Sequence, residues 1–139
     1  MPLSVIHARS AIGIKAPLIT IEVHISAGLP AFNVVGLPHR SISEAKERVR
    51  SAILNSGLTF PPKRITINLS PADLPKQGAR FDLAIAVGIL AASGQIPINQ
   101  LHHYEFMGEL ALSGELRPVA GAFIAALSLP RTKSLITCS

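Results

Sequence analysis

Residues 18–26 read LITIEVHIS, and their side chains alternate between apolar and polar along the whole stretch. The apolar positions are Ile19, Ile21, Val23 and Ile25. Because successive side chains of a strand point to opposite faces of a sheet, this pattern predicts a β-strand with one buried face. Weaker strand patterns lie on both sides, at residues 3–9 and 31–35, with turn residues between them. Residues 1–36 therefore predict an antiparallel β-meander.

The sequence that follows predicts an amphipathic helix and a further strand. Ser41 and Glu44 match the capping box, in which each side chain accepts a free backbone N–H of the opening turn. A helix is therefore expected over residues 42–56, where apolar side chains recur at helical spacing, and Gly57 suits the left-handed residue that ends a helix. Residues 64–69 alternate again, which predicts a strand with its isoleucines facing inward.

The second half of the chain predicts one buried helix, a hairpin and a short helix. Residues 81–93 are apolar on all sides, which indicates a helix in the core. Asp82 would complement the helix dipole, and Gly88 would mark a close backbone approach. Residues 105–117 are expected to form a hairpin around Ser-Gly, and residues 121–129 a short apolar helix.

The predicted order is β-β-β-α-β-α-β-β-α, which indicates an α+β fold: a two-layer β-α sandwich with helices against one sheet. The chain has 139 residues, of which 48% are hydrophobic, enough for one core. Residues 1–139 are therefore expected to form a single domain, with residues 130–139 poorly ordered.

The charge balance is compatible with a nucleic-acid partner without requiring one. Thirteen Lys and Arg outnumber eight Asp and Glu, a formal net charge of +5. The single cysteine, Cys138, excludes an internal disulfide and fits a reducing cytosol. No secretion signal is visible, and the most apolar run, residues 83–92, is about half of the roughly 20 residues that cross a bilayer. We expect a soluble cytoplasmic protein with no membrane partner.

Two kinds of site are missing from the sequence. No Gly-x-x-x-x-Gly-Lys-Ser/Thr loop and no Gly-x-Gly-x-x-Gly fingerprint occur, so this chain is expected to bind no nucleotide cofactor. The histidines are scattered, and the neighbours His102 and His103 would point apart in a strand, so no metal site is expected.

Residues 70–82 read SPADLPKQGARFD, the most informative polar segment of the chain. Together with GLP at 36–38, RVRSAI at 48–53, NSG at 55–57 and GELAL at 108–112, this run closely resembles the N-terminal region of the ComM/YifB family. The members of this family are bacterial Mg-chelatase-like AAA+ ATPases. The resemblance covers residues 3–121 and weakens over 122–139.

The resemblance implies a non-catalytic accessory domain of a ring-forming motor, similar to a hexameric helicase that drives branch migration in natural transformation. Its partners would be the other subunits of the ring and DNA. The family's ATPase module, with its ATP and Mg, would lie beyond residue 139, so the chain is expected to be a fragment or a truncated product.

The resemblance also implies a fold shared with the Lon protease domain and the C-terminal domain of RadA. Lon-type peptidases use a serine nucleophile and a lysine base. Matching the segments places Arg80 at the serine position and Phe123 at the lysine position, and neither side chain can perform those steps, so no catalytic residue is expected. An active peptidase remains an alternative function, with Ser70 and Lys76 as the candidate pair.

The family motif loop contains Asp73, Pro75, Gly78 and Asp82 and carries two candidate contact residues, Lys76 and Arg80. They lie next to a predicted helix N-terminus, where free N–H groups favour anions, so the loop could meet phosphates or carboxylates. Alternatively its charges are only solvated, or Arg80 pairs with Asp82 or Asp73.

A second candidate surface for DNA or partner contact is the helix face with Lys46, Arg48 and Arg50. Glu44 and Glu47 interrupt it, so a solvated face with pairs such as Glu44 to Arg48 is the alternative. A free-standing nucleic-acid-binding module is less favoured, because the phenylalanines lie in apolar contexts that indicate core positions rather than a stacking platform. Any DNA binding is expected to be weak and independent of base sequence.

Overall fold

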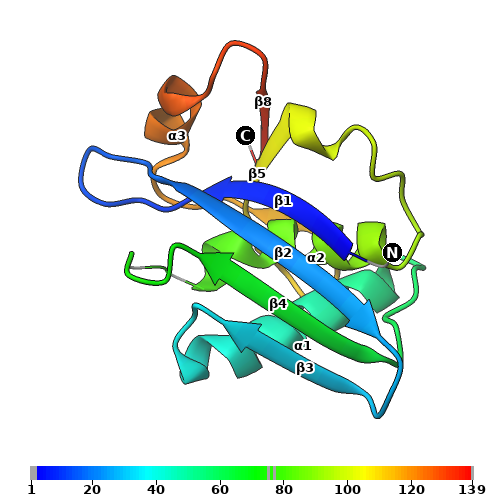
Figure 1. The fold of residues 1–139 in the computed structure, drawn as a ribbon. Coiled ribbons are helices and arrows are strands. Elements are labelled where there is room, and N and C mark those ends of the chain that lie inside the picture. Colours follow the sequence, from blue (N-terminus) through cyan, green and yellow to red (C-terminus); the bar gives the residue numbers. More distant parts are fainter. Residues whose placement is uncertain (1–2, 75, 77, 139) are drawn as a thin grey trace.

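The structure, a computed structural model, describes residues 3–74, 76 and 78–138. The described residues form a six-stranded sheet in the order β3-β4-β2-β1-β5-β8 and a separate two-stranded sheet of β6 and β7 (Figure 1). The strands are β1 (Leu3–Arg9), β2 (Leu18–Ser26), β3 (Ala31–Val35), β4 (Arg64–Ser70), β5 (Tyr104–Met107), β6 (Glu109–Leu110), β7 (Leu116–Arg117) and β8 (Ser134–Thr137). The helices are α1 (His39–Asn55), α2 (Asp82–Ala92) and α3 (Ala122–Ser128), with short 3-10 turns η1 (Gly78–Phe81) and η2 (Leu101–His103).

Helices α1 and α2 cover one face of the sheet, and the main core lies between these two layers (Figure 1). The isoleucines and valine of β2 are buried, as the alternation predicts. Helix α2 is buried on nearly all sides, and α1 buries one stripe, as their sequences indicate. The predicted α+β two-layer sandwich is confirmed. No helix among the described residues has the length and apolar character needed to span a bilayer.

The strand partners differ from the predicted meander. Strands β1 and β2 pair antiparallel as expected, but β3 pairs in parallel with β4 at the edge of the sheet. Strand β2 already has β1 and β4 as antiparallel neighbours, so β3 has no free edge of β2 to join. Alternation tells which face of a strand is buried, but it contains no information about which strand lies beside it.

The predicted hairpin at 105–117 is divided between two sheets. Strand β5 joins the main sheet in parallel with β1 and β8, and only β6 and β7 form the hairpin. In the C-terminal segment, strand β8 at residues 134–137 extends the main sheet. Residues 134–137 read SLIT, which does not alternate between apolar and polar side chains, so no strand pattern is recognised there.

The start of α1 also differs from the prediction. The helix begins at His39 with Pro38 as its N-cap residue, and no side chain caps it, so Ser41 and Glu44 lie inside the first turns and form no capping box. Proline has its φ fixed near the helical value, which allows the helix to begin two residues before the serine.

The close approach predicted at Gly88 is confirmed. A Cβ atom there would lie 2.6 Å from Cγ2 of Val23 on the adjacent sheet. The Ser4 hydroxyl donates a 2.7 Å hydrogen bond to the Gly88 carbonyl oxygen, so α2 sits directly on β1 and β2.

Candidate nucleic-acid interface

The five basic residues predicted to make contacts occupy three different environments. Lys46 and Arg50 are exposed on α1, Arg48 is partly buried on another side of the same helix, and Lys76 and Arg80 are buried. The structure therefore brings together only Lys46 and Arg50, which are one helical turn apart.

Lys46 and Arg50 line a groove between α1, the edge strand β3 and the segment that leads into β4. The groove has a volume of about 280 Å³. Its lining residues are Pro30, Ala31, Phe32, Lys46, Arg50, Leu54, Phe60, Pro61, Pro62 and Lys63. Three basic side chains and no acidic one are found there among the described residues. We call this surface the basic groove.

Two phenylalanine rings form the apolar part of the basic groove. The ring centroids of Phe32 and Phe60 are 6.3 Å apart, and the rings are inclined by 31°. Both residues are half-buried: they pack against the core and also line the groove. Their packing against the core agrees with the expectation from the sequence, and they line the groove in addition. Phe32 is on an edge strand, so no further strand covers it.

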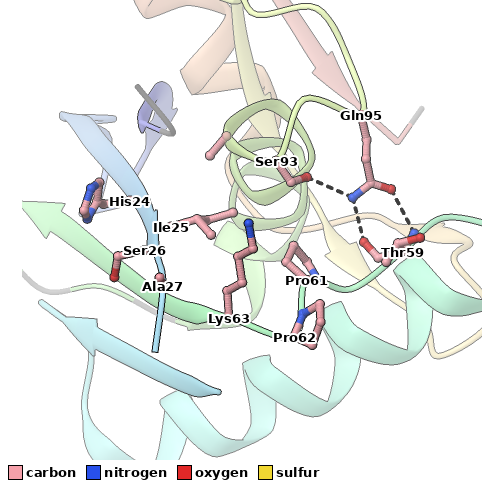
Figure 2. Close-up of a pocket in the computed structure, with 11 residues that line it drawn as sticks. His24, Ile25, Ser26, Ala27, Thr59, Pro61, Pro62, Lys63, Ser93 and Gln95 are labelled. Carbon is pink, nitrogen blue, oxygen red and sulfur yellow. Dashed lines mark hydrogen bonds between the residues drawn. The ribbon is translucent and has the colours of Figure 1, made fainter. Parts of the chain in front are cut away.

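A second hollow, of about 660 Å³, lies beside the groove and shares Pro61, Pro62 and Lys63 with it. It is bounded by residues 24–27 at the end of β2 and by the end of α2 (Figure 2). Figure 2 shows the Lys63 side chain extending between Ile25 and Pro61. Lys63 therefore lines both hollows. It is not among the contact residues predicted from the sequence.

Hydrogen bonds hold the segment between α1 and β4 in place. Gln95 Nε2 donates to the Thr59 carbonyl oxygen at 2.7 Å and to Ser93 Oγ at 2.9 Å (Figure 2). The Thr59 N–H donates to Gln95 Oε1 at 2.8 Å. Because Thr59 precedes Phe60 and the two prolines, these bonds fix the apolar wall that separates the hollows.

Arg48 has a structural partner instead of a surface role. Its Nε and Nη2 donate to the Asp82 carboxylate at 2.6 and 3.2 Å, and the Leu110 N–H donates to the same carboxylate at 3.1 Å. Asp82 is fully buried, and burial raises its pKa from 3.8 to about 6 against the opposing effect of Arg48. The ion pair joins α1, α2 and β6. Arg48 pairs with Asp82, whereas the alternatives considered from the sequence were Glu44 with Arg48 and Arg80 with Asp82.

The two cations of the family motif loop are not at the surface. Arg80 is 3% exposed and Lys76 is 8% exposed, which corrects the expectation that the loop presents them to a partner. Arg80 Nη2 donates to the Ala120 carbonyl oxygen, and Lys76 Nζ donates to the Leu74 carbonyl oxygen at 3.1 Å. No ion pair joins Arg80 to Asp73 or Asp82 among the described residues. We therefore leave Lys76 and Arg80 out of the interface.

The other loop residues have local roles or lie outside the description. Asp73 is exposed, and Gly78 packs so closely that a Cβ would lie 2.7 Å from the Ser41 Cβ. Pro75 and the side chain of Phe123 lie outside the described residues.

Arg80 gives a stability prediction. Burial lowers the pKa of its guanidinium, and its Nε has no hydrogen-bond partner among the described residues. Removing an uncompensated buried charge while keeping the volume is often neutral or stabilising. We expect Arg80→Met to unfold thermally at or above the temperature of the wild type, and Arg80→Lys to unfold below the methionine variant. A methionine variant several degrees less stable than the lysine variant would contradict this interpretation.

A second buried ion cluster was not predicted from the sequence. Glu105 is fully buried and accepts hydrogen bonds from Arg9 Nε at 2.7 Å and from Lys133 Nζ at 3.4 Å. His7 lies beside it, and burial together with Lys133 lowers the pKa of His7. The cluster ties the segment before β8 to β1 and β5, which is a structural role.

The remaining candidate sites gain no chemistry from the structure. Ser70 Oγ donates to the Thr20 carbonyl oxygen at 3.5 Å, whereas Lys76 bonds Leu74, so the two members of the alternative peptidase pair have different partners. His102 and His103 lie in η2 with ring centroids 4.0 Å apart, instead of pointing apart. No group of three or more potential metal-ligating side chains occurs in the part of the chain described.

The family of the chain follows from comparison with known proteins. A family model for subunit ChlI of Mg-chelatase matches residues 21–137, most of the chain. The chain belongs to this family. The ChlI match extends beyond residue 121, so it includes the region where the motif resemblance is weak.

Two relatives specify the branch of the ChlI family that this chain resembles. YifB of Escherichia coli is 59% identical over 126 residues, which cover 91% of this chain and 25% of YifB. Competence protein ComM of Haemophilus influenzae is 53% identical over 133 residues, which cover 96% of this chain and 26% of ComM. The resemblance to the ComM/YifB family is confirmed. The chain spans about a quarter of the length of these relatives.

Proposed function

We propose that this chain is a non-catalytic accessory domain of a Mg-chelatase-like AAA+ ATPase, and that its basic groove contacts DNA in a ring assembly. The observation that carries the proposal is the groove itself, where Lys46, Arg50 and Lys63 line the same hollow as two half-buried phenylalanine rings, with no acidic lining residue among those described. A surface of this kind attracts phosphates through charge and leaves the base sequence unread.

The family supports the remainder of the proposal. ATP and Mg would bind in the part of the ComM-like proteins that this chain does not cover, and the domain would work in the cytoplasm as part of a hexamer. The resemblance implies that Arg80 replaces the serine of a Lon-type peptidase, and in this chain its guanidinium contacts the Ala120 carbonyl oxygen in the segment just before α3. A guanidinium at this place supports a structural role for the segment.

Fluorescence anisotropy of a labelled DNA oligonucleotide, measured across a salt series, tests the contact with DNA. We expect a dissociation constant on the order of 10⁻⁴ to 10⁻⁶ M that rises steeply with salt. The double variant Lys46→Ala/Arg50→Ala should weaken binding and reduce the salt slope by about two, because two phosphate contacts are lost.

The matched control is Lys15→Ala/Arg131→Ala, which removes the same charge from two exposed positions outside the groove. We expect it to retain most of the binding. Equal losses in the two double variants would show that overall charge, rather than the groove, attracts DNA. Nanomolar binding that neither variant changes would place the DNA site elsewhere.

A further inference from the structure

The basic groove contains more than a phosphate site requires. Phosphate contacts need only cations and N–H donors, yet the lining of this groove also includes the neighbouring rings of Phe32 and Phe60. In duplex DNA the bases are stacked and paired inside the helix, so aromatic side chains in the groove cannot stack on them. Unpaired bases have free faces that stack on aromatic side chains.

The volume of the groove suits one segment of a polymeric ligand better than a complete small-molecule ligand. Its volume of about 280 Å³ lies just below the range of roughly 300–1,000 Å³ that is usual for sites enclosing a drug-sized ligand. The larger hollow continues directly on the other side of Pro61 and Pro62, with Lys63 between them. A flexible strand could therefore cross the two prolines and occupy both hollows, with a phosphate beside Lys63.

The charges and the rigidity of the surface also suit a flexible, negatively charged strand as the ligand. Lys46 and Arg50 line the groove from α1, and Lys63 lines it from the segment that leads into β4. The bonds of Gln95 to Thr59 hold the wall in place before any ligand arrives, so little conformational freedom is lost on binding.

We infer that the basic groove binds single-stranded nucleic acid, with a base against Phe60 and Phe32 and the flanking phosphates on Lys46, Arg50 and Lys63. This inference rests on the proposed function and specifies the form of nucleic acid that the groove takes. The larger hollow, with His24 and Ser26 at its border, receives the next part of the strand.

The test compares three labelled ligands of equal length at low salt: a thymidine oligonucleotide, an abasic oligonucleotide with the same phosphates, and a duplex. We expect the thymidine strand to bind about tenfold more tightly than the abasic strand, since one stacked base contributes an effect of this order. The duplex should bind no more tightly than the abasic strand. A uridine oligoribonucleotide of the same length shows whether the groove discriminates between DNA and RNA strands, and a base-dependent affinity for either supports the inference.

Two variants separate stacking from charge. Phe60→Leu keeps an apolar side chain and should reduce the affinity for the thymidine strand to that for the abasic strand, while the affinity for the abasic strand stays unchanged. Lys46→Ala/Arg50→Ala should weaken the binding of both strands. Phe32→Leu provides a second variant in case the leucine at position 60 alters the fold.

The outcomes distinguish this inference from the proposed function. Equal affinity for the thymidine strand, the abasic strand and the duplex, still lowered by Lys46→Ala/Arg50→Ala, would overturn the inference and leave the DNA contact intact. Absence of salt-dependent binding to any of them would overturn both. Tighter binding of the duplex than of the thymidine strand would also contradict the inference.

Discussion

Replacing Arg48 with alanine is expected to destabilise the fold by about 3–5 kcal/mol, because it leaves the buried Asp82 carboxylate without its cation. Asp82 is fully buried and joins three elements through Arg48 and the Leu110 N–H. Chemical denaturation at pH 8, monitored by circular dichroism, measures the loss. The matched control is Arg50→Ala, two residues along the same helix and exposed, for which we expect less than about 0.5 kcal/mol.

The loss in Arg48→Ala should depend on pH. Asp82 keeps its proton up to about pH 6 in the folded state, whereas the unfolded chain releases it near 3.8. Below pH 6 the carboxyl is therefore neutral in the folded protein and needs no cation. We expect the difference in unfolding free energy between wild type and Arg48→Ala to be smaller at pH 5 than at pH 8. A loss that is equal at both values would show that Arg48 stabilises by packing and not by its charge.

In the wild type, the raised pKa of Asp82 also makes the unfolding free energy depend on pH. Between about pH 4 and 6 the folded state binds more protons than the unfolded state, so the contribution of Asp82 to the unfolding free energy falls as the pH rises through this window. His7 acts in the opposite sense, because its pKa is lowered on folding. Comparing the wild type with Asp82→Asn cancels the effect of His7 and isolates that of Asp82.

Phe81→Ala is the second substitution with a large expected effect, again about 3–5 kcal/mol. The Phe81 side chain is 0% exposed and belongs to the main core. Backbone bonds on either side of it, from Leu83 N to Gly108 O and from Gly108 N to Arg80 O, both 3.1 Å, tie this turn to the end of β5. The surroundings therefore have little freedom to collapse into the cavity that alanine leaves.

Leu112→Ala provides the control for Phe81, because Leu112 is 57% exposed and its loss should cost little. From the sequence, Lys76→Ala would have been the exposed counterpart, but Lys76 is buried and so is unsuitable. Thermal melts of the two variants should differ by about 10 °C or more. Similar melting temperatures would show that Phe81 contributes little to the core.

The elements with long periodic patterns could be predicted from the sequence, and the partners of the strands could not. The alternation of β2 and β4 and the apolar character of α2 determine which side chains are buried. The position of β3 beside β4 depends on which sheet edge remains free, a property of the whole fold. Strand β8 has only four residues and pairs with β5, about 30 positions earlier in the chain, so local patterns do not reveal it.

The candidate interface was predictable in part. The helical positions of Lys46 and Arg50 follow from the amphipathic pattern of α1, which leaves both side chains exposed. The burial of Arg80 was not predictable, since a charged side chain next to Gly78 usually indicates a solvated loop. Phe60 and Lys63 line the groove because they belong to the segment between α1 and β4, which borders it. In the sequence, Pro61 and Pro62 indicate only that regular structure is interrupted there.

The most direct test of the account is a two-dimensional ¹H–¹⁵N NMR titration of the isotope-labelled chain with a single-stranded oligonucleotide. We expect the amide signals that shift most to belong to residues around the basic groove, among them Phe32, Lys46, Arg50, Phe60 and Lys63, and those of Lys15 and Arg131 to stay unchanged. Shifts centred on Lys15 and Arg131, or no shifts at oligonucleotide concentrations that saturate binding in anisotropy, would contradict it.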